Sequence, residues 1–103
     1  MSDLPKFRAI IDGIDDQIVD LLARRFAMCR DVAEYKLRHG IPVVLPERIE
    51  QVKARCAERA GRQGLDGAFV AALYTLIIER ACEAERQVQA GVRRSGDENP
   101  EPP

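Results

Sequence analysis

The chain has 103 residues, enough for one domain, and its formal net charge of −1 leaves no excess of lysine and arginine for binding nucleic acid. Hydrophobic residues make up 46% of the chain and charged residues 32%, tryptophan is absent, and the apolar residues follow helical spacing, so we expect an all-α protein. No segment approaches the roughly eighteen apolar residues of a membrane span, and the N-terminus lacks a signal-peptide pattern. We therefore expect a cytoplasmic protein without a membrane partner.

The first predicted helix is long and runs from about residue 3 to residue 39. Asp3 is its candidate N-cap, Pro5 lies in its first turn, and Gly40 is a stop signal. At about 1.5 Å per residue this helix exceeds about 50 Å, more than the width of a domain of this mass. A second copy of the chain should therefore cover part of its apolar stripe. The stripe consists of Leu4, Phe7, Ile11, Ile14, Ile18, Leu21, Met28, Val32 and Tyr35.

The rest of the sequence predicts an extended connector from Ile41 to Pro46, two further helices and a tail. Pro46 ends the connector and opens a short helix, and a long helix extends from the candidate N-cap Asp66 to about Ala90. Residues 1–90 would then form a long-short-long helical domain. Residues 91–103 are polar and rich in charge, proline and glycine, so we expect a disordered tail there.

Two cations lie on the apolar face of the first predicted helix. Arg25 occupies a position of the stripe, and Lys36 follows eleven residues later, which returns it to within roughly 20° of Arg25, about 16 Å further along. Burying an unpaired charge costs several kcal/mol, so these side chains need a carboxylate or an anionic ligand. Arg8 and Arg48 are further cations that a helical fold can bring to the same region. The alternative is that all four are surface charges matched by the 17 acidic residues.

Other kinds of chemistry find little support in the sequence. Cys29, Cys56 and Cys82 are odd in number and lie in helical patterns, which favours small buried or half-buried hydrophobic roles over disulfides or a zinc site. His39 precedes a glycine, where a cation is favourable at a helix C-terminus. No nucleophile with a base partner, glycine-rich phosphate loop or metal-ligand spacing is present, so we expect neither a metal nor a cofactor.

Seven short motifs follow one another along the chain in a characteristic order and spacing. They are Phe7-Arg8, the Arg24-Arg25 pair, Tyr35-Lys36, Pro46-Glu47-Arg48, Gly64-Leu65-Asp66, Leu73-Tyr74 and Ile77-Ile78-Glu79. In this arrangement they resemble the all-helical chorismate mutases, and the similarity covers nearly everything before the tail. The resemblance implies an intertwined homodimer with two equivalent sites, an isomerase activity on a small dicarboxylate substrate, and no cofactor. It leaves activation by a partner enzyme open.

The resemblance also implies roles for individual residues. Arg25 and Arg8, the latter contributed by the partner chain, would hold the two carboxylates of the substrate. Lys36 would reach a carboxylate and the ether oxygen, and Arg48 would close the pocket. These cations suit a unimolecular Claisen rearrangement, which needs a compact conformer and stabilisation of negative charge on the breaking ether oxygen, but no base or nucleophile.

Three positions depart from the common mutase pattern. Glu85 stands where typical members carry a glutamine that donates to the ether oxygen; a carboxylate cannot donate, so Glu85 would have to be protonated, which predicts an acid-shifted pH profile. Ile49 stands where a glutamate accepts from the C4 hydroxyl of chorismate. Ala81 replaces a serine one turn before Glu85 and weakens carboxylate recognition.

An apolar residue at position 49 resembles two specialised branches of the family. The 4-amino-4-deoxychorismate mutases are similar in Gly40-Ile41-Pro42, in the segment from Pro46 to Ile49, and in Cys82-x-x-Glu85. Isochorismate pyruvate lyase acts on a substrate without a C4 hydroxyl but usually keeps glutamine at position 85, so the first branch is favoured. An ordinary chorismate mutase that tolerates Ile49, the lyase, and a non-catalytic helical dimerisation or regulatory module are the alternatives.

Overall fold

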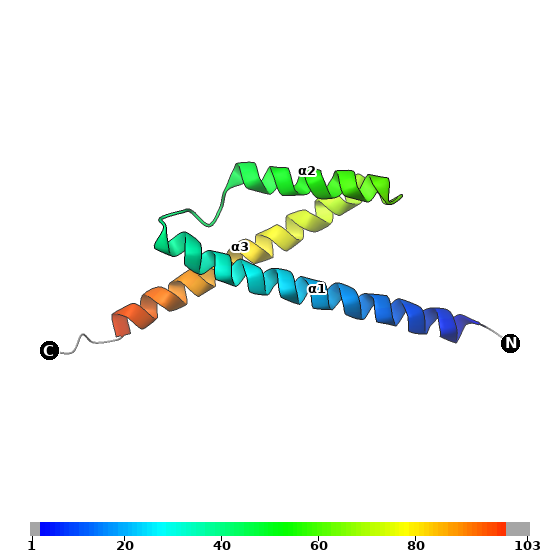
Figure 1. Ribbon diagram of the computed structural model, residues 1–103, viewed down its shortest axis with the longest axis horizontal. Coiled ribbons are helices and arrows are strands. Elements are labelled where there is room, and N and C mark those ends of the chain that lie inside the picture. The colour runs from blue at the N-terminus through cyan, green and yellow to red at the C-terminus, as the bar shows by residue number, and fades with distance from the viewer. Residues whose placement is uncertain (1–2, 99–103) are drawn as a thin grey trace.

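The computed structural model describes residues 3–98, with side chains as far as Arg94. Three helices make up this part of the chain: α1 (Leu4–Arg38), α2 (Pro46–Arg62) and α3 (Gly67–Glu98). The expected all-α fold and the long-short-long order are confirmed. Figure 1 shows that α3 crosses α1, that α2 runs alongside the first half of α3, and that the N-terminal half of α1 extends away from the other two helices.

The helix ends follow from local chemistry. Gly40 adopts a left-handed φ of 65°, and the amide of Ile41 donates to the carbonyl of Lys36 at 2.8 Å, so α1 ends in a Schellman motif. Gly64, with a φ of 79°, ends α2 in the same way. Asp66 caps α3 as expected, because its Oδ1 accepts from the amide of Ala68 at 2.9 Å.

Two sequence predictions about the helix ends need correction. Asp3 occupies the N-cap position of α1, but its side chain makes no capping hydrogen bond. The third helix does not stop near Ala90, and residues 91–98, which we expected in the disordered tail, continue it to Glu98. A helix that is already formed adds each residue without a new nucleation cost, so a polar segment can extend it. The rest of the predicted tail, residues 99–103, lies outside the described residues.

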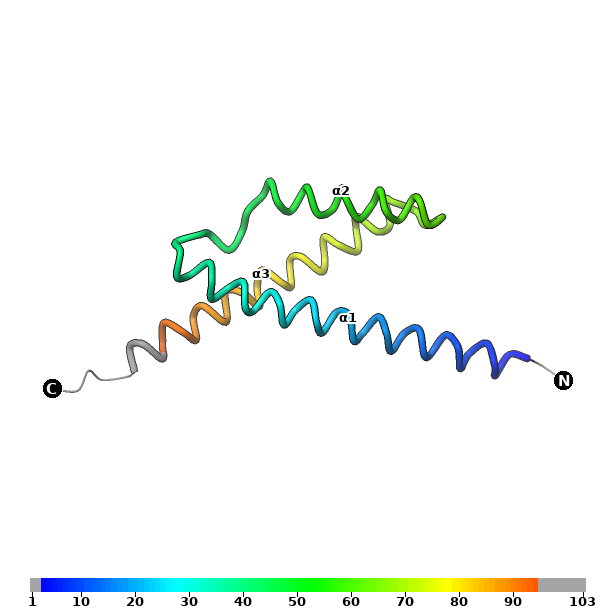
Figure 2. The backbone as a smooth tube through the Cα atoms, viewed as in Figure 1, coloured from blue at the N-terminus to red at the C-terminus, as the bar shows by residue number. Residues whose placement is uncertain are grey.

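The core lies where α2, α3 and the connector meet. Val52, Ile78 and Cys82 form its buried cluster, and half-buried side chains from the connector and from α2 and α3 pack around it. Ala33 on α1 is fully buried, since a small side chain lets α3 approach closely at the crossing. The trace in Figure 2 shows that this contact involves only the C-terminal half of α1.

Much of the apolar stripe of α1 is exposed in the single chain. Phe7 is 59% exposed and Ile18 51%, and on α3 Phe69 is 59% exposed. The described chain measures 76 × 33 × 15 Å, so one copy has no second layer that covers these side chains. Within residues 3–98, none of the helices has the length and apolar character that crossing a membrane requires.

Candidate active site

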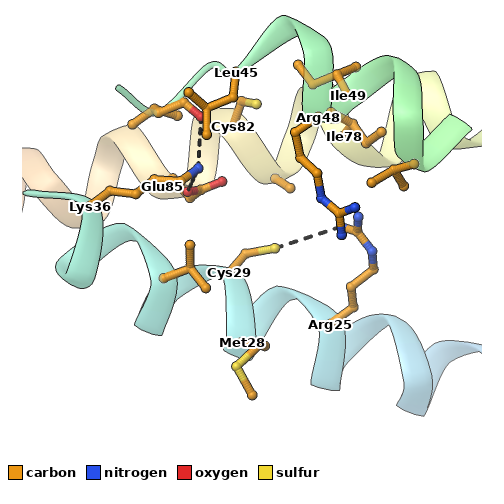
Figure 3. Close-up of a pocket in the computed structure, with 14 residues that line it drawn as sticks. Arg25, Met28, Cys29, Lys36, Leu45, Arg48, Ile49, Ile78, Cys82 and Glu85 are labelled. Carbon is orange, nitrogen blue, oxygen red and sulfur yellow. Dashed lines mark hydrogen bonds and ion pairs between the residues drawn. The ribbon is translucent and has the colours of Figure 1, made fainter. Parts of the chain in front are cut away.

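A cavity of about 410 Å³ lies between the C-terminal half of α1, the connector, the start of α2 and the middle of α3. Its wall contains six of the seven residues that the sequence singled out: Arg25, Lys36, Arg48, Ile49, Ala81 and Glu85. Figure 3 shows the charged members of this set extending into the cavity from three helices. Segments distant in sequence therefore meet at one cationic pocket with apolar walls.

Lys36 is held by two partners at one end of this cavity. Its Nζ donates to Glu85 Oε1 and to the backbone carbonyl of Val43, both at 2.9 Å. The side chains are largely buried, with 13% of Lys36 and 7% of Glu85 exposed. An ammonium group has three N–H donors, so one remains for a ligand. The ion pair also joins α1 to α3, while the Val43 contact ties the connector to α1.

Arg25 lies near the other end of the cavity and is held only by weak contacts. Its Nη1 lies 3.8 Å from the sulfur of Cys29, and its guanidinium carbon lies 5.7 Å from the ring centroid of Tyr74. A thiol sulfur is a poor acceptor, and a cation–π contact uses the face of the guanidinium, so the planar donors remain free for a carboxylate. Arg25 forms no ion pair with any carboxylate of the described residues.

Arg48 reaches toward the same end of the cavity from α2. Its Nη1 donates to Gln51 Oε1 at 2.8 Å, and within the part of the chain that the structure describes it has no acidic partner either. The surface-charge alternative required an acidic partner for each of these arginines. The described residues provide none. Two cations without acidic partners at one cavity favour an anionic ligand between them.

Arg8 is the one predicted site residue that the structure does not bring to the cavity. It is exposed on the N-terminal half of α1, seventeen residues before Arg25. That separation corresponds to about 26 Å along a helix, far beyond the reach of an arginine side chain. Arg8 cannot serve the cavity of its own chain.

Neutral residues that the sequence analysis did not assign to the site line the cavity or contact its charged side chains. Tyr74 supports Arg25, Cys29 follows it by one turn, and Met28 lines the cavity. Helical spacing could have predicted two of these neighbours. Cys29 lies four residues after Arg25, and Tyr74 lies four residues before the buried Ile78, so each pair shares a helix face. The role of the Val43 carbonyl had no sequence signal, since any residue supplies that group.

The cysteines behave as the sequence predicted. Cys82 is buried, Cys29 and Cys56 are half-buried, and all three are free thiols. Burial raises the pKa of the Cys82 thiol, and the nearby Glu85 carboxylate raises it further. Burial also raises the pKa of Tyr74, with a hydrogen bond to Cys56 as the next cause. Among residues 3–98, no cluster of three histidine, cysteine or acidic side chains is placed to hold a metal ion.

The fold and the cavity define an all-helical protein whose cavity is lined by the cations Arg25, Lys36 and Arg48. The chain belongs to the chorismate mutase type II family, whose model matches residues 7–98. It is accordingly an isomerase of the chorismate mutase type.

Two similar proteins are 4-amino-4-deoxychorismate mutases from Streptomyces. The one from Streptomyces venezuelae is 37% identical over 89 residues, which cover 86% of each chain. The one from Streptomyces pristinaespiralis is 38% identical over 82 residues, which cover 80% of this chain and 64% of the relative. A chorismate mutase of Methanocaldococcus jannaschii is 31% identical over 87 residues, covering 84% of this chain and 88% of the relative. Relatives named 4-amino-4-deoxychorismate mutase and a relative named chorismate mutase therefore both align with most of this chain.

Proposed function

We propose that the protein converts 4-amino-4-deoxychorismate to 4-amino-4-deoxyprephenate. The observation that carries this proposal is Ile49, a half-buried apolar side chain in the wall of the cavity beside Arg48. An isoleucine cannot accept a hydrogen bond from a C4 hydroxyl. The two Streptomyces relatives, which carry the name of this specialised mutase, support the same choice.

The reaction breaks the ether C–O bond of the substrate while a new C–C bond forms within the same molecule. The residues of the chain supply position and charge, not a covalent partner. Arg25 and the partner subunit's Arg8 hold the two carboxylate groups, and Arg48 closes the pocket, which keeps the two reacting ends together. The remaining N–H of Lys36 stabilises the negative charge that develops on the ether oxygen.

Glu85 completes this arrangement in its protonated form. In the structure the Glu85 carboxylate accepts from Lys36. A dicarboxylate substrate brings negative charge to Lys36 and competes with Glu85 for it. A carboxylate only accepts, so the side chain must carry a proton to act as a donor toward the ether oxygen.

The complete site requires two chains in this proposal. The partner subunit's Arg8 supplies the cation that a single chain cannot bring to the cavity, and the exposed apolar stripe of α1 supplies the contact surface. Large exposed apolar faces are typical of obligate interfaces. Sedimentation equilibrium at micromolar concentration should give twice the mass of 11.5 kDa. A monomer under these conditions would contradict the shared site.

Ordinary chorismate mutase activity is the second candidate, because the Methanocaldococcus jannaschii relative carries that name. Steady-state assays with chorismate, 4-amino-4-deoxychorismate and isochorismate at pH 5.5 and 7.5 separate the candidates. We expect the highest kcat/KM for the amino compound. Preference for chorismate would reassign the protein to the ordinary mutase, pyruvate release from isochorismate would indicate a lyase, and inactivity with all three would favour a non-catalytic module.

A further inference from the structure

A second tie between α1 and α3 lies directly beside the Lys36–Glu85 ion pair. Gln89 is buried, with 7% of the residue exposed, and its Nε2 donates to the backbone carbonyl of Ala33 at 3.1 Å. Gln89 follows Glu85 by one turn of α3, and Ala33 precedes Lys36 by about one turn of α1. The two contacts are therefore neighbours and join the same two helices.

Gln89 acts from outside the active-site cavity. It is absent from the wall of that cavity but lines a neighbouring one, about 350 Å³, on which Lys36 also borders. The amide thus lies behind Lys36 and has no direct access to a substrate bound in front of it. Any influence of Gln89 on catalysis must pass through the position of α1.

The bond to Ala33 is costly to lose. The Ala33 carbonyl also takes part in the backbone bonding of α1, but the buried side-chain amide of Gln89 pays its desolvation penalty if it lacks this partner. Ala33 has no exposed surface, so water cannot replace the Gln89 amide without moving the helices apart. The Gln89–Ala33 bond therefore holds the two helices together at this level, in addition to the close packing of Ala33.

We propose that Gln89 is a positioning residue for the reaction, which rests on the function proposed for the cavity. When a substrate carboxylate competes for Lys36, the ion pair with Glu85 weakens. The Gln89–Ala33 bond involves no substrate-binding group and persists through this exchange. It holds α1 against α3, so that Lys36 and Glu85 face the ether oxygen together.

Gln89→Met tests this role because methionine has a similar length but no N–H donor. We expect kcat to fall at least about tenfold while KM changes by less than about threefold, since displacement of a catalytic group by about 1 Å costs up to about a hundredfold in rate. Gln87→Met is the matched control: it makes the same change on an exposed position of α3 and should leave both constants unchanged.

Thermal unfolding recorded for each variant ensures that rates refer to folded protein. Should Gln89→Met fail to fold, Gln89→Asn decides, because it keeps a polar amide but withdraws the donor from Ala33; a several-fold loss of kcat at constant KM is expected. A folded variant with wild-type kcat, or one in which only KM changes, would overturn the positioning role. Inactivity of the wild-type protein on all three substrates would instead overturn the proposed function.

Discussion

Lys36 on α1 and Glu85 on α3 form a largely buried ion pair, with Nζ and Oε1 2.9 Å apart, although 49 residues separate them in the sequence. The pair closes one end of the cavity and orients the ammonium group of Lys36. Arg25 and Arg48, at the other end, have no such partner among the described carboxylates. The site is thus neutralised where Lys36 lies and positively charged where the arginines lie.

The Lys36–Glu85 pair predicts a specific pattern of stabilities. Lys36→Met leaves the Glu85 carboxylate buried without a partner, so the free energy of unfolding at pH 7.5 should fall by about 3–5 kcal/mol. Adding Glu85→Gln removes that charge and should restore much of the loss. Urea unfolding at a fixed protein concentration measures both. Arg86→Met is the control, because its contact with Glu83 is long, at 3.6 Å, and exposed, and should change stability little. A double variant no more stable than the single one would contradict the prediction.

Protonation of Glu85 predicts higher activity in acid. Glu85 can donate to the ether oxygen only when it carries a proton, so kcat/KM of the wild type should be higher at pH 5.5 than at pH 7.5. Glu85→Gln donates at every pH and should flatten this profile. Glu79→Gln, which neutralises an exposed acid on the same helix, should keep the wild-type profile. An unchanged profile in Glu85→Gln would refute the donor role.

The shared site predicts complementation between two inactive variants. Arg8→Ala and Lys36→Met should each lose at least about a hundredfold in kcat/KM, because each removes an oriented cation. In a mixed dimer, the cavity of the Arg8→Ala chain keeps Lys36 and receives Arg8 from its partner. Mixing the unfolded variants and refolding them together should therefore restore activity. Each mixed dimer regains one active site of its two. Refolding each variant alone is the control, and no recovery on mixing would place Arg8 outside the site.

Ile49 should control the choice between a hydroxyl and an amino group at C4. Ile49→Glu introduces an acceptor for the hydroxyl, and a hydrogen bond to a charged group contributes about 1.5–3 kcal/mol, so kcat/KM for chorismate should increase by about tenfold or more. Ile49→Leu keeps an apolar side chain and should preserve the wild-type preference. Equal responses of the two variants to chorismate would show that position 49 does not read this substituent.

The raised pKa of Cys82 predicts a loss of stability in alkaline solution. The folded protein holds the thiol proton more tightly than the unfolded chain does, so this contribution is complete below the unfolded pKa and is lost as the pH rises through the folded value. Between pH 8 and pH 10 the free energy of unfolding should fall by up to about 1.4 kcal/mol per pH unit from this group. The free energy of unfolding of Cys82→Ala should fall less over this range. Tyr74, whose pKa is also raised, is present in both proteins and contributes equally to both. Parallel curves would exclude a contribution from Cys82.

The helices are largely local in origin, which is why periodicity, prolines and glycines predicted their order and most of their ends. Gly40 and Gly64 stop α1 and α2 because each adopts the left-handed conformation that other residues avoid. The end of α3 was wrong by eight residues, since composition alone does not show how far a formed helix extends. Charge on an apolar face likewise singled out Arg25 and Lys36 before any fold was known.

The sequence by itself determined the helices, the apolar stripe and the residues that carry charge. Only the tertiary structure decided which of these groups meet: Lys36 with Glu85 and the Val43 carbonyl, Arg25 with Tyr74, and Gln89 with Ala33 across 56 residues. Helical periodicity is a property of neighbouring residues, whereas these contacts depend on where two helices cross. The crossing is set by close packing around small side chains such as Ala33, which no local pattern records.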